Sequence, residues 1–114
     1  MNTLSIASDF AMAPGPRYRE EGEHSGEQFR MEVLAPAVKE AIQKQSKLQI
    51  DLDGTFGYGT SFLEEAFGGL IRLNNYKLAD LKRIITFKSD EEPELIEEIQ
   101  SYMEDAERQE HSDG

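Results

Sequence analysis

A glycine-rich stretch that carries several hydroxyl groups, DGTFGYGTSFLEEAFGGL (residues 53–70), holds the side chains best suited to chemistry in this sequence. It joins a segment with strand periodicity to one with helical periodicity, and such a junction can bind a phosphate or carry a phosphorylated hydroxyl. The stretch lacks the G-x-x-x-x-G-K-[ST] pattern of a Walker loop, and no lysine occurs between residues 48 and 76. We therefore expect no P-loop nucleotide site here.

Two neighbouring hydroxyls in this stretch, Thr60 and Ser61, are the candidate phosphorylation sites. Glu64 follows Ser61 at the spacing of a capping box, so we assign the Ser61 hydroxyl to capping the helix that follows. Thr60 is then the freer hydroxyl at the start of that helix, where the helix dipole favours a phosphate. We therefore rank Thr60 first as a phosphosite and Ser61 second.

The elements that position these hydroxyls alternate between strand and helix. Apolar periodicity predicts strands at residues 3–7, 48–52 and 83–87, and helices at 25–45, 62–71 and 95–106. Ser25 and Gln28 have capping-box spacing at the start of the first helix, and Pro36 is expected to kink or split it. The long loop at residues 8–24 has room for a short strand near residues 17–19.

Strands that alternate with helices favour parallel pairing. We predict an α/β fold, a small sandwich with a mixed, mainly parallel sheet of about four strands and three or four helices. The extra strand, from residues 8–20, would be antiparallel. Residues 1–108 are expected to form a single domain, followed by a flexible acidic tail at 109–114.

The loops that leave the carboxyl ends of parallel strands gather at one edge of the sheet, where sites form. Here these loops are residues 8–25, 53–61 and 88–92. They supply five predicted contacts for an anion or a partner, namely Arg17, Arg19, Ser25, Asp53 and Tyr58. If the site is instead enzymatic, His24 is the plausible general base at neutral pH.

The net charge of -11 is concentrated at the C-terminal end, because residues 90–114 hold eleven acidic side chains and one arginine. This acidic segment is either a solubilising helix face or a docking surface for a basic partner. The remainder is nearly neutral, so we expect no nucleic-acid binding. The sequence lacks a long apolar run, a signal-peptide pattern and cysteine, and we therefore expect a cytoplasmic protein without a membrane span.

The block LQIDLDGTFGYGTSFLEEAFGGLIRL (residues 48–73) resembles the strand, loop and helix of STAS domains, the fold of anti-anti-sigma factors. PGPR, SGEQFR and SFLEEAFGGL are also similar to segments of a small bacterial STAS-like family of unknown function, so the resemblance spans most of residues 3–106. It implies a regulatory module that a partner kinase of the GHKL ATPase class phosphorylates on the first hydroxyl of a signature. By position that hydroxyl is Thr60, followed by Ser61, with Gly59 where the regulators have an aspartate.

We therefore expect a non-catalytic interaction module that binds a protein partner through the 54–71 edge and is switched by phosphorylation. The expected partner is a GHKL-type ATPase or kinase, or a regulator that it controls. The alternative is a small nucleotide- or anion-binding protein or enzyme that uses the same strand edge. We assign no cofactor and no metal.

Overall fold

The computed structural model describes residues 2–113, with side chains as far as His111. Three parallel strands form one sheet in the order β1-β2-β3, and their bounds are Asn2–Ser5, Leu48–Asp51 and Ile85–Lys88. The register places Leu4 beside Ile50 and Ile50 beside Phe87. The predicted α/β class is confirmed. Within residues 2–113, however, the sheet has three strands rather than about four, and it is wholly parallel rather than mixed.

The extra strand expected within residues 8–20 does not form in the described part of the chain. Ile6–Asp9 form a short helix, α1, and Arg19–Glu21 form a 3-10 turn, η1. Side chains bind the backbone amides that a sheet ladder would need: the Glu21 carboxylate accepts the Tyr18 N–H at 2.9 Å, and Glu27 accepts the Arg19 N–H at 3.0 Å. Local hydrogen bonds of this kind compete with strand pairing.

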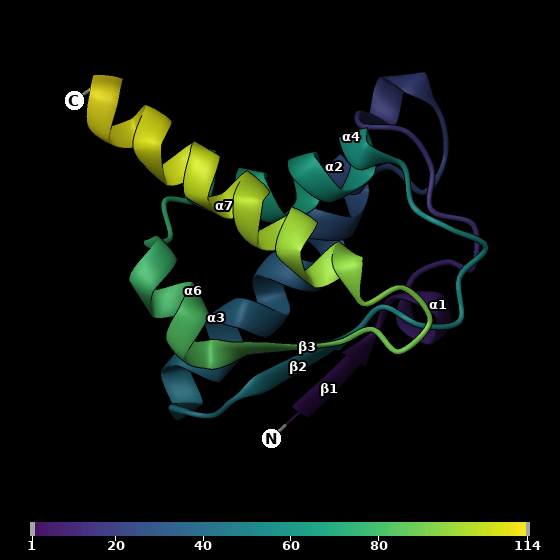
Figure 1. The fold of residues 1–114 in the computed structure, drawn as a ribbon, viewed down its shortest axis with the longest axis horizontal. Coiled ribbons are helices and arrows are strands. Elements are labelled where there is room, and N and C mark those ends of the chain that lie inside the picture. Colours follow the sequence, from purple (N-terminus) through teal and green to yellow (C-terminus); the bar gives the residue numbers. More distant parts are fainter. Residues whose placement is uncertain (1, 114) are drawn as a thin grey trace.

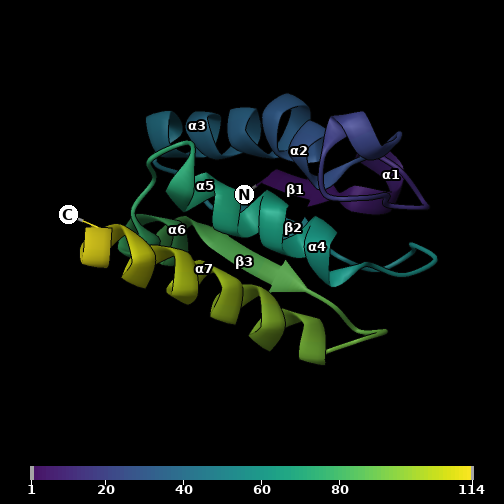
Figure 2. The same cartoon turned by 90° about the horizontal axis from the view of Figure 1, so that it is seen from above.

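All the long helices lie on one face of the sheet (Figures 1 and 2). Crossovers of one hand between strands in sequential order place their helices on the same face. Two of the helices are composite, since each is made of three consecutive segments. The first composite helix consists of α2 (Gly26–Phe29), η2 (Arg30–Leu34) and α3 (Ala35–Lys44). The second combines α4 (Thr60–Leu63), η3 (Glu64–Gly68) and α5 (Gly69–Arg72). Two further helices are α6 (Leu78–Ile84) and α7 (Glu94–Asp113).

Both composite helices contain a π turn, η2 in the first and η3 in the second. Pro36 lies in the first turn of α3, two residues after the end of η2. In a regular α-helix the proline ring would clash with the carbonyl of Glu32, and the wider turn relieves that clash. The helix therefore continues through Pro36 to Lys44 and is not split there (Figure 2).

The core fills the space between the sheet and the helices, and three phenylalanines form its centre. The Phe29 ring lies 5.7 Å from that of Phe62 and 6.5 Å from that of Phe67, and all three side chains are fully buried. Burial of each such side chain stabilises the fold by roughly 1.5–3 kcal/mol. The opposite face of the sheet is polar, because Thr3, Gln49 and Thr86 share one row of the register there.

The last helix, α7, packs an apolar stripe of Leu95, Ile99 and Met103 into this core. It runs on to Asp113, so the segment after residue 108 that the sequence assigned to a flexible tail is helical as far as the structure describes it, and Gly114 lies outside the described residues. No helix among the described residues is long and apolar enough to cross a bilayer.

Candidate functional site

Three loops meet at the carboxyl edge of the sheet, as the strand order predicts (Figure 1). The Phe56 N–H donates to the Met12 carbonyl at 2.8 Å, which joins the loop after β1 to the loop after β2. The Gly54 N–H donates to the Glu91 carboxylate at 2.8 Å, which joins the loop after β2 to the loop after β3. The edge is therefore one connected surface built from three distant segments of the chain.

Asp53 holds the second and third of these loops together. Its carboxylate accepts hydrogen bonds from Lys88 Nζ at 2.8 Å and from the amides of Glu91 at 2.9 Å and Asp90 at 3.1 Å. These hydrogen bonds lower the pKa of Asp53 to about 2, and the bond from Lys88 has the largest effect, ahead of the bond from the Glu91 amide. With these partners Asp53 fixes the loops, and its oxygens are already engaged within the protein.

Tyr58 attaches the loop after β2 to the core. Its hydroxyl donates to the Leu52 carbonyl at 2.8 Å, and its ring lies 6.0 Å from the ring of Phe62 in the core. Burial raises the pKa of Tyr58 to about 12. The hydroxyl therefore stays protonated at neutral pH and acts as a donor to the backbone.

Phe56 projects from the apex of this loop and is the large apolar side chain most open to solvent, at 82% exposure. Gly54 and Gly57 flank the apex with φ angles of 93° and 133°, a region that glycine adopts without steric cost. Met12, bonded to Phe56 through the backbone, is itself 52% exposed. Sequence reasoning missed this pair, although a phenylalanine between two glycines in a polar loop is a visible signal.

Thr60 and Ser61 are both exposed in the first turn of α4. The prediction that Ser61 caps this helix is wrong, because the helix begins at Thr60 and Gly59 occupies the N-cap position without a side-chain bond. Glu64, the expected return partner in the capping box, is bound instead by Arg17 at 2.5 Å and by Arg72. Both hydroxyls are thus open to solvent at the edge.

The two arginines predicted to clamp an anion are both engaged in ion pairs. Arg17 binds Glu64 at 2.5 Å, and this hydrogen bond raises the pKa of Arg17. Arg19 binds Glu32 at 2.8 Å on the surface of the first composite helix. Since each guanidinium already has a carboxylate partner, neither is presented at the edge as a free anion site.

Ser25 and His24 also serve the local fold. The Ser25 side chain is fully buried, and its hydroxyl accepts the Gln28 N–H at 2.9 Å, which confirms its predicted role as a helix cap. This position removes Ser25 from the exposed edge. His24 is exposed with a φ of 58°, and its ring meets the edge of the Phe10 ring at 5.7 Å.

A buried ion pair joins the two π turns behind this edge, and sequence reasoning missed it as well. Arg30 in η2 lies 3.1 Å from Glu65 in η3, and these side chains are 5% and 3% exposed. Arg30 also donates to the Asn74 side chain at 2.9 Å. The only sequence signal was the presence of Arg30 and Glu65 within runs of apolar residues.

Two glycines make room for this pair. A Cβ on Gly69 would lie 2.6 Å from Arg30 Nε, and a Cβ on Gly26 would lie 2.6 Å from the Phe62 carbonyl oxygen. Gly68 and Gly69 lower the helix propensity of this segment. The close approach of Arg30 to Gly69 explains why a glycine is found inside the helix at that position. Glu64, next to Glu65 in the sequence, is partly exposed. Burial acts to raise the pKa of Glu64, but the hydrogen bonds from Arg72 and Arg17 lower this pKa overall.

The edge presents apolar and hydroxyl side chains to solvent. Within the described residues, no group of three or more His, Cys, Asp or Glu side chains could hold a metal ion. The exposed side chains of the edge include an apolar pair, Met12 and Phe56, and the hydroxyl residues Thr60 and Ser61, which follow Phe56 within five residues along the chain. Such a surface suits contact with another protein.

A known family shares the part of the chain that contains the second and third of these loops. A family model described as "STAS-like domain of unknown function (DUF4325)" matches residues 25–95, which is more than half of the chain. Searches of curated proteins and of solved structures gave no match. The matched segment contains β2, β3 and both composite helices. The resemblance seen in residues 48–73 is thereby confirmed, and the chain belongs to the family of STAS-like domains of unknown function.

Proposed function

We propose that this STAS-like domain is a non-catalytic interaction module that binds a protein partner through the edge formed by residues 54–71 and Met12. The observation that carries the proposal is the 82% exposure of Phe56 at the apex of a firmly held loop. Aromatic side chains are frequent hot spots of protein interfaces, because one ring removes a large apolar area from water on binding.

The loop is ordered before any partner arrives. Asp53 accepts a hydrogen bond from Lys88 and the Phe56 amide donates one to Met12, both at 2.8 Å, and these bonds tie the loop to two neighbouring segments. The Tyr58 hydroxyl donates to the Leu52 carbonyl at the base of the same loop, also at 2.8 Å. A partner that covers Phe56 therefore has little loop entropy to remove, and more of the contact energy appears as affinity. This pre-organisation favours a recognition role over that of a loose connector.

The charges around Phe56 indicate the chemistry of the partner surface. Asp90 and Glu91 lie on the adjoining loop, and the Glu91 carboxylate reaches the Gly54 amide, two residues from Phe56. We infer a partner with an apolar pocket for Phe56 and basic residues at its rim, because complementary charge speeds association and rejects wrong partners.

Thr60 is the position at which we propose that binding is regulated, with Ser61 beside it. Both hydroxyls are exposed within five residues of Phe56. A phosphate there would add about two negative charges next to the contact surface and change its complementarity. Incubation with ATP and an extract of the source cells should add one phosphate, detected by intact-mass analysis. The Thr60→Val variant should lose this modification while Ser61→Ala retains it; an unmodified wild-type protein contradicts the regulatory part of the proposal alone.

The interaction itself is tested by site-specific photocrosslinking in the source cells. A benzophenone side chain at position 56 should capture a discrete partner protein. The same side chain at position 73 is the matched control, because Leu73 is also an exposed apolar residue, at 58%, but lies beyond the end of α5. Equal capture at both positions, or none at 56, would overturn the proposed edge.

A further inference from the structure

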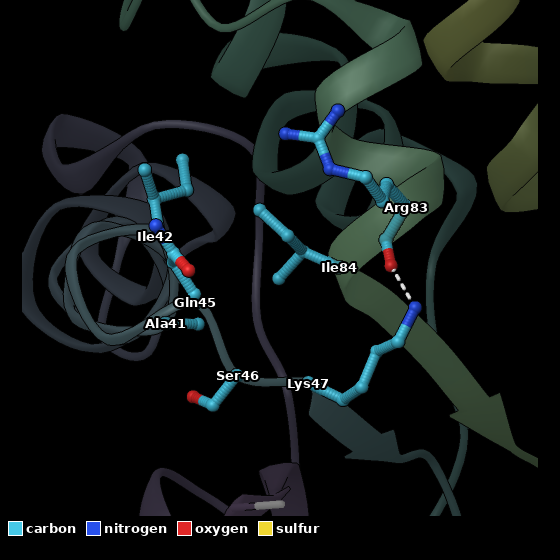
Figure 3. Close-up of a pocket in the computed structure, with 7 residues that line it drawn as sticks. All are labelled: Ala41, Ile42, Gln45, Ser46, Lys47, Arg83 and Ile84. Carbon is cyan, nitrogen blue, oxygen red and sulfur yellow. Dashed lines mark hydrogen bonds between the residues drawn. The ribbon is translucent and has the colours of Figure 1, made fainter.

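A hollow lies away from the proposed interaction edge, at the amino ends of β2 and β3 (Figure 3). It has a volume of about 520 Å³ and opens between the C-terminal ends of α3 and α6. This volume falls within the roughly 300–1,000 Å³ typical of small-molecule sites. Its lining residues are Ala41, Ile42, Gln45, Ser46, Lys47, Arg83 and Ile84.

One part of the lining is apolar. In Figure 3 the Ile84 side chain points from α6 toward α3, where Ala41 and Ile42 lie. Ala41 and Ile84 belong to the buried core and are held in place by it. The hollow therefore offers a fixed apolar wall against which a short hydrocarbon chain or ring can pack.

The other part of the lining carries two cations and, among the seven lining residues, no carboxylate. Lys47 Nζ donates to the Arg83 carbonyl, so the ammonium group compensates the negative end of α6 with one of its three N–H donors. The Arg83 guanidinium binds Asp80 at 3.1 Å, and both side chains of this pair are exposed, Arg83 at 66%. Exposed pairs of this kind are weak, so the guanidinium can exchange Asp80 for another carboxylate.

Ser46 adds a third polar group at the wall. Its Oγ is buried and has no hydrogen-bond partner among the described residues. A buried hydroxyl without a partner is uncommon and calls for one. Ser46 is one of the residues that line the hollow.

We propose that this hollow binds a small organic acid with an apolar tail. The carboxylate pairs with the Arg83 guanidinium, whose planar fork matches two carboxylate oxygens, and receives a further hydrogen bond from Lys47. The tail packs against Ile42 and Ile84. This site is separate from the interaction edge and does not depend on the function proposed for that edge.

Titration of octanoate into the isotopically labelled full chain, followed by amide NMR, tests the site. The amides of residues 41–47 and 81–85 should shift and saturate, while those of residues 54–61 stay in place. Octylammonium, which has the same chain with the opposite charge, and acetate, which lacks the chain, should give no saturable shifts in these segments. Shifts confined to other segments, or equal binding of octylammonium, would overturn the proposal.

Variants separate the cation from general charge effects. Arg83→Gln should weaken octanoate binding about three- to tenfold, as expected for loss of a charge-assisted hydrogen bond at a partly exposed site. Lys82→Gln is the matched control, because it makes the same charge change on the same helix but does not line the hollow. Its affinity should stay within about twofold of the unmodified protein, since a solvated charge that does not line the hollow makes no direct contact with the ligand and is screened by salt. Equal weakening by both variants would show that the hollow has no defined carboxylate contact.

Discussion

The carboxylate of Asp53 fixes the positions of two loops at once, and its protonation should therefore report on the edge. It binds Lys88 Nζ and the amides of Asp90 and Glu91, and its pKa is lowered from 3.8 to about 2 in the folded protein. Because the folded-state pKa is depressed, this group stabilises the fold above the unfolded pKa. The stabilisation is lost as the pH falls through the folded pKa.

We predict that Asp53→Asn lowers the free energy of unfolding at neutral pH, and that the difference from the unmodified protein shrinks between about pH 5 and pH 2. Urea denaturation at a series of pH values measures this difference. Asp105→Asn is the control, since Asp105 lies on the exposed surface of α7 and pairs with its neighbour Arg108. A difference for Asp53→Asn that stays constant down to about pH 2 would show that the carboxylate charge does not hold the loops.

Residue types alone indicated where the edge would lie but not which side chains it would expose. Thr60 was correctly placed at a helix start, whereas the cap assigned to Ser61 failed because Arg17, distant in sequence, binds Glu64. The exposure of Phe56 depends on the backbone turn between Gly54 and Gly57. Apolar periodicity describes faces of strands and helices, and a single side chain at a loop apex carries no period.

The two composite helices approach closely at Gly69, and this contact gives a prediction at the scale of the element. Gly69→Ala should destabilise the protein by about 1–3 kcal/mol, because the added Cβ would overlap Arg30 Nε and Cδ at 2.6 and 2.8 Å. This loss occurs even though alanine has the better helix propensity, by about 1 kcal/mol. Arg30 cannot move aside, since Glu65 and Asn74 hold it.

Gly59→Ala is the control for this substitution. A Cβ at Gly59 meets nothing within 4 Å, and the residue has a negative φ of -76°. Loss of the glycine at this N-cap position should cost less than about 1 kcal/mol. Equal midpoints of urea denaturation for the two variants would contradict the close contact between the helices.

Removal of either partner of the Arg30–Glu65 pair should strongly destabilise the packing of these two helices. We expect Arg30→Met to lower the free energy of unfolding by about 3 kcal/mol, the lower end of the range for breaking a buried ion pair. Glu65 then keeps only its longer contacts, to Arg17 at 3.6 Å and to Arg72 at 3.8 Å. The double variant Arg30→Met, Glu65→Leu should recover more than half of this loss, since no charge then remains buried.

A double-mutant cycle by urea denaturation measures the coupling, and the Arg19–Glu32 pair supplies the comparison. These two residues also form an arginine–glutamate contact at 2.8 Å, but their side chains are nearly half exposed. Arg19→Met should therefore cost at most about 1 kcal/mol. A double variant as unstable as the sum of the two single variants would show that Arg30 and Glu65 act independently.

The helices and strands were predicted best where a strong apolar periodicity coincides with a clear start or stop signal in the sequence. The strand around residues 48–51 and the helix that begins after Ser25 appear as expected. The strand expected at residues 83–87 begins only at Ile85, because Arg83 and Ile84 complete α6. A run of β-branched residues does not mark such a boundary, since the helix and the strand share one apolar stretch. Pro36 was the only sequence signal of an irregularity near the first π turn, and no such signal was recognised for the second.

At the scale of the whole molecule, the fold separates two surfaces of different chemistry. The carboxyl edge of the sheet joins an apolar apex to acidic residues such as Asp90 and Glu91, whereas the opposite end carries Lys47 and Arg83. The parallel strand order, which the alternation of strands and helices predicts, is what collects distant loops into these two ends. The sequence could therefore locate the edge, while the identity of its contact residues required the loop geometry.

The central claim is that this domain recognises a protein through Phe56, and the most direct measurement is the affinity of the purified partner captured at that position. Isothermal titration calorimetry should compare the unmodified domain with Phe56→Ala and Leu73→Ala. We predict that Phe56→Ala weakens binding by about tenfold or more, as expected for a hot-spot aromatic residue, and that Leu73→Ala changes it by less than about twofold. An unchanged dissociation constant for Phe56→Ala, in a variant with wild-type stability, would contradict the account.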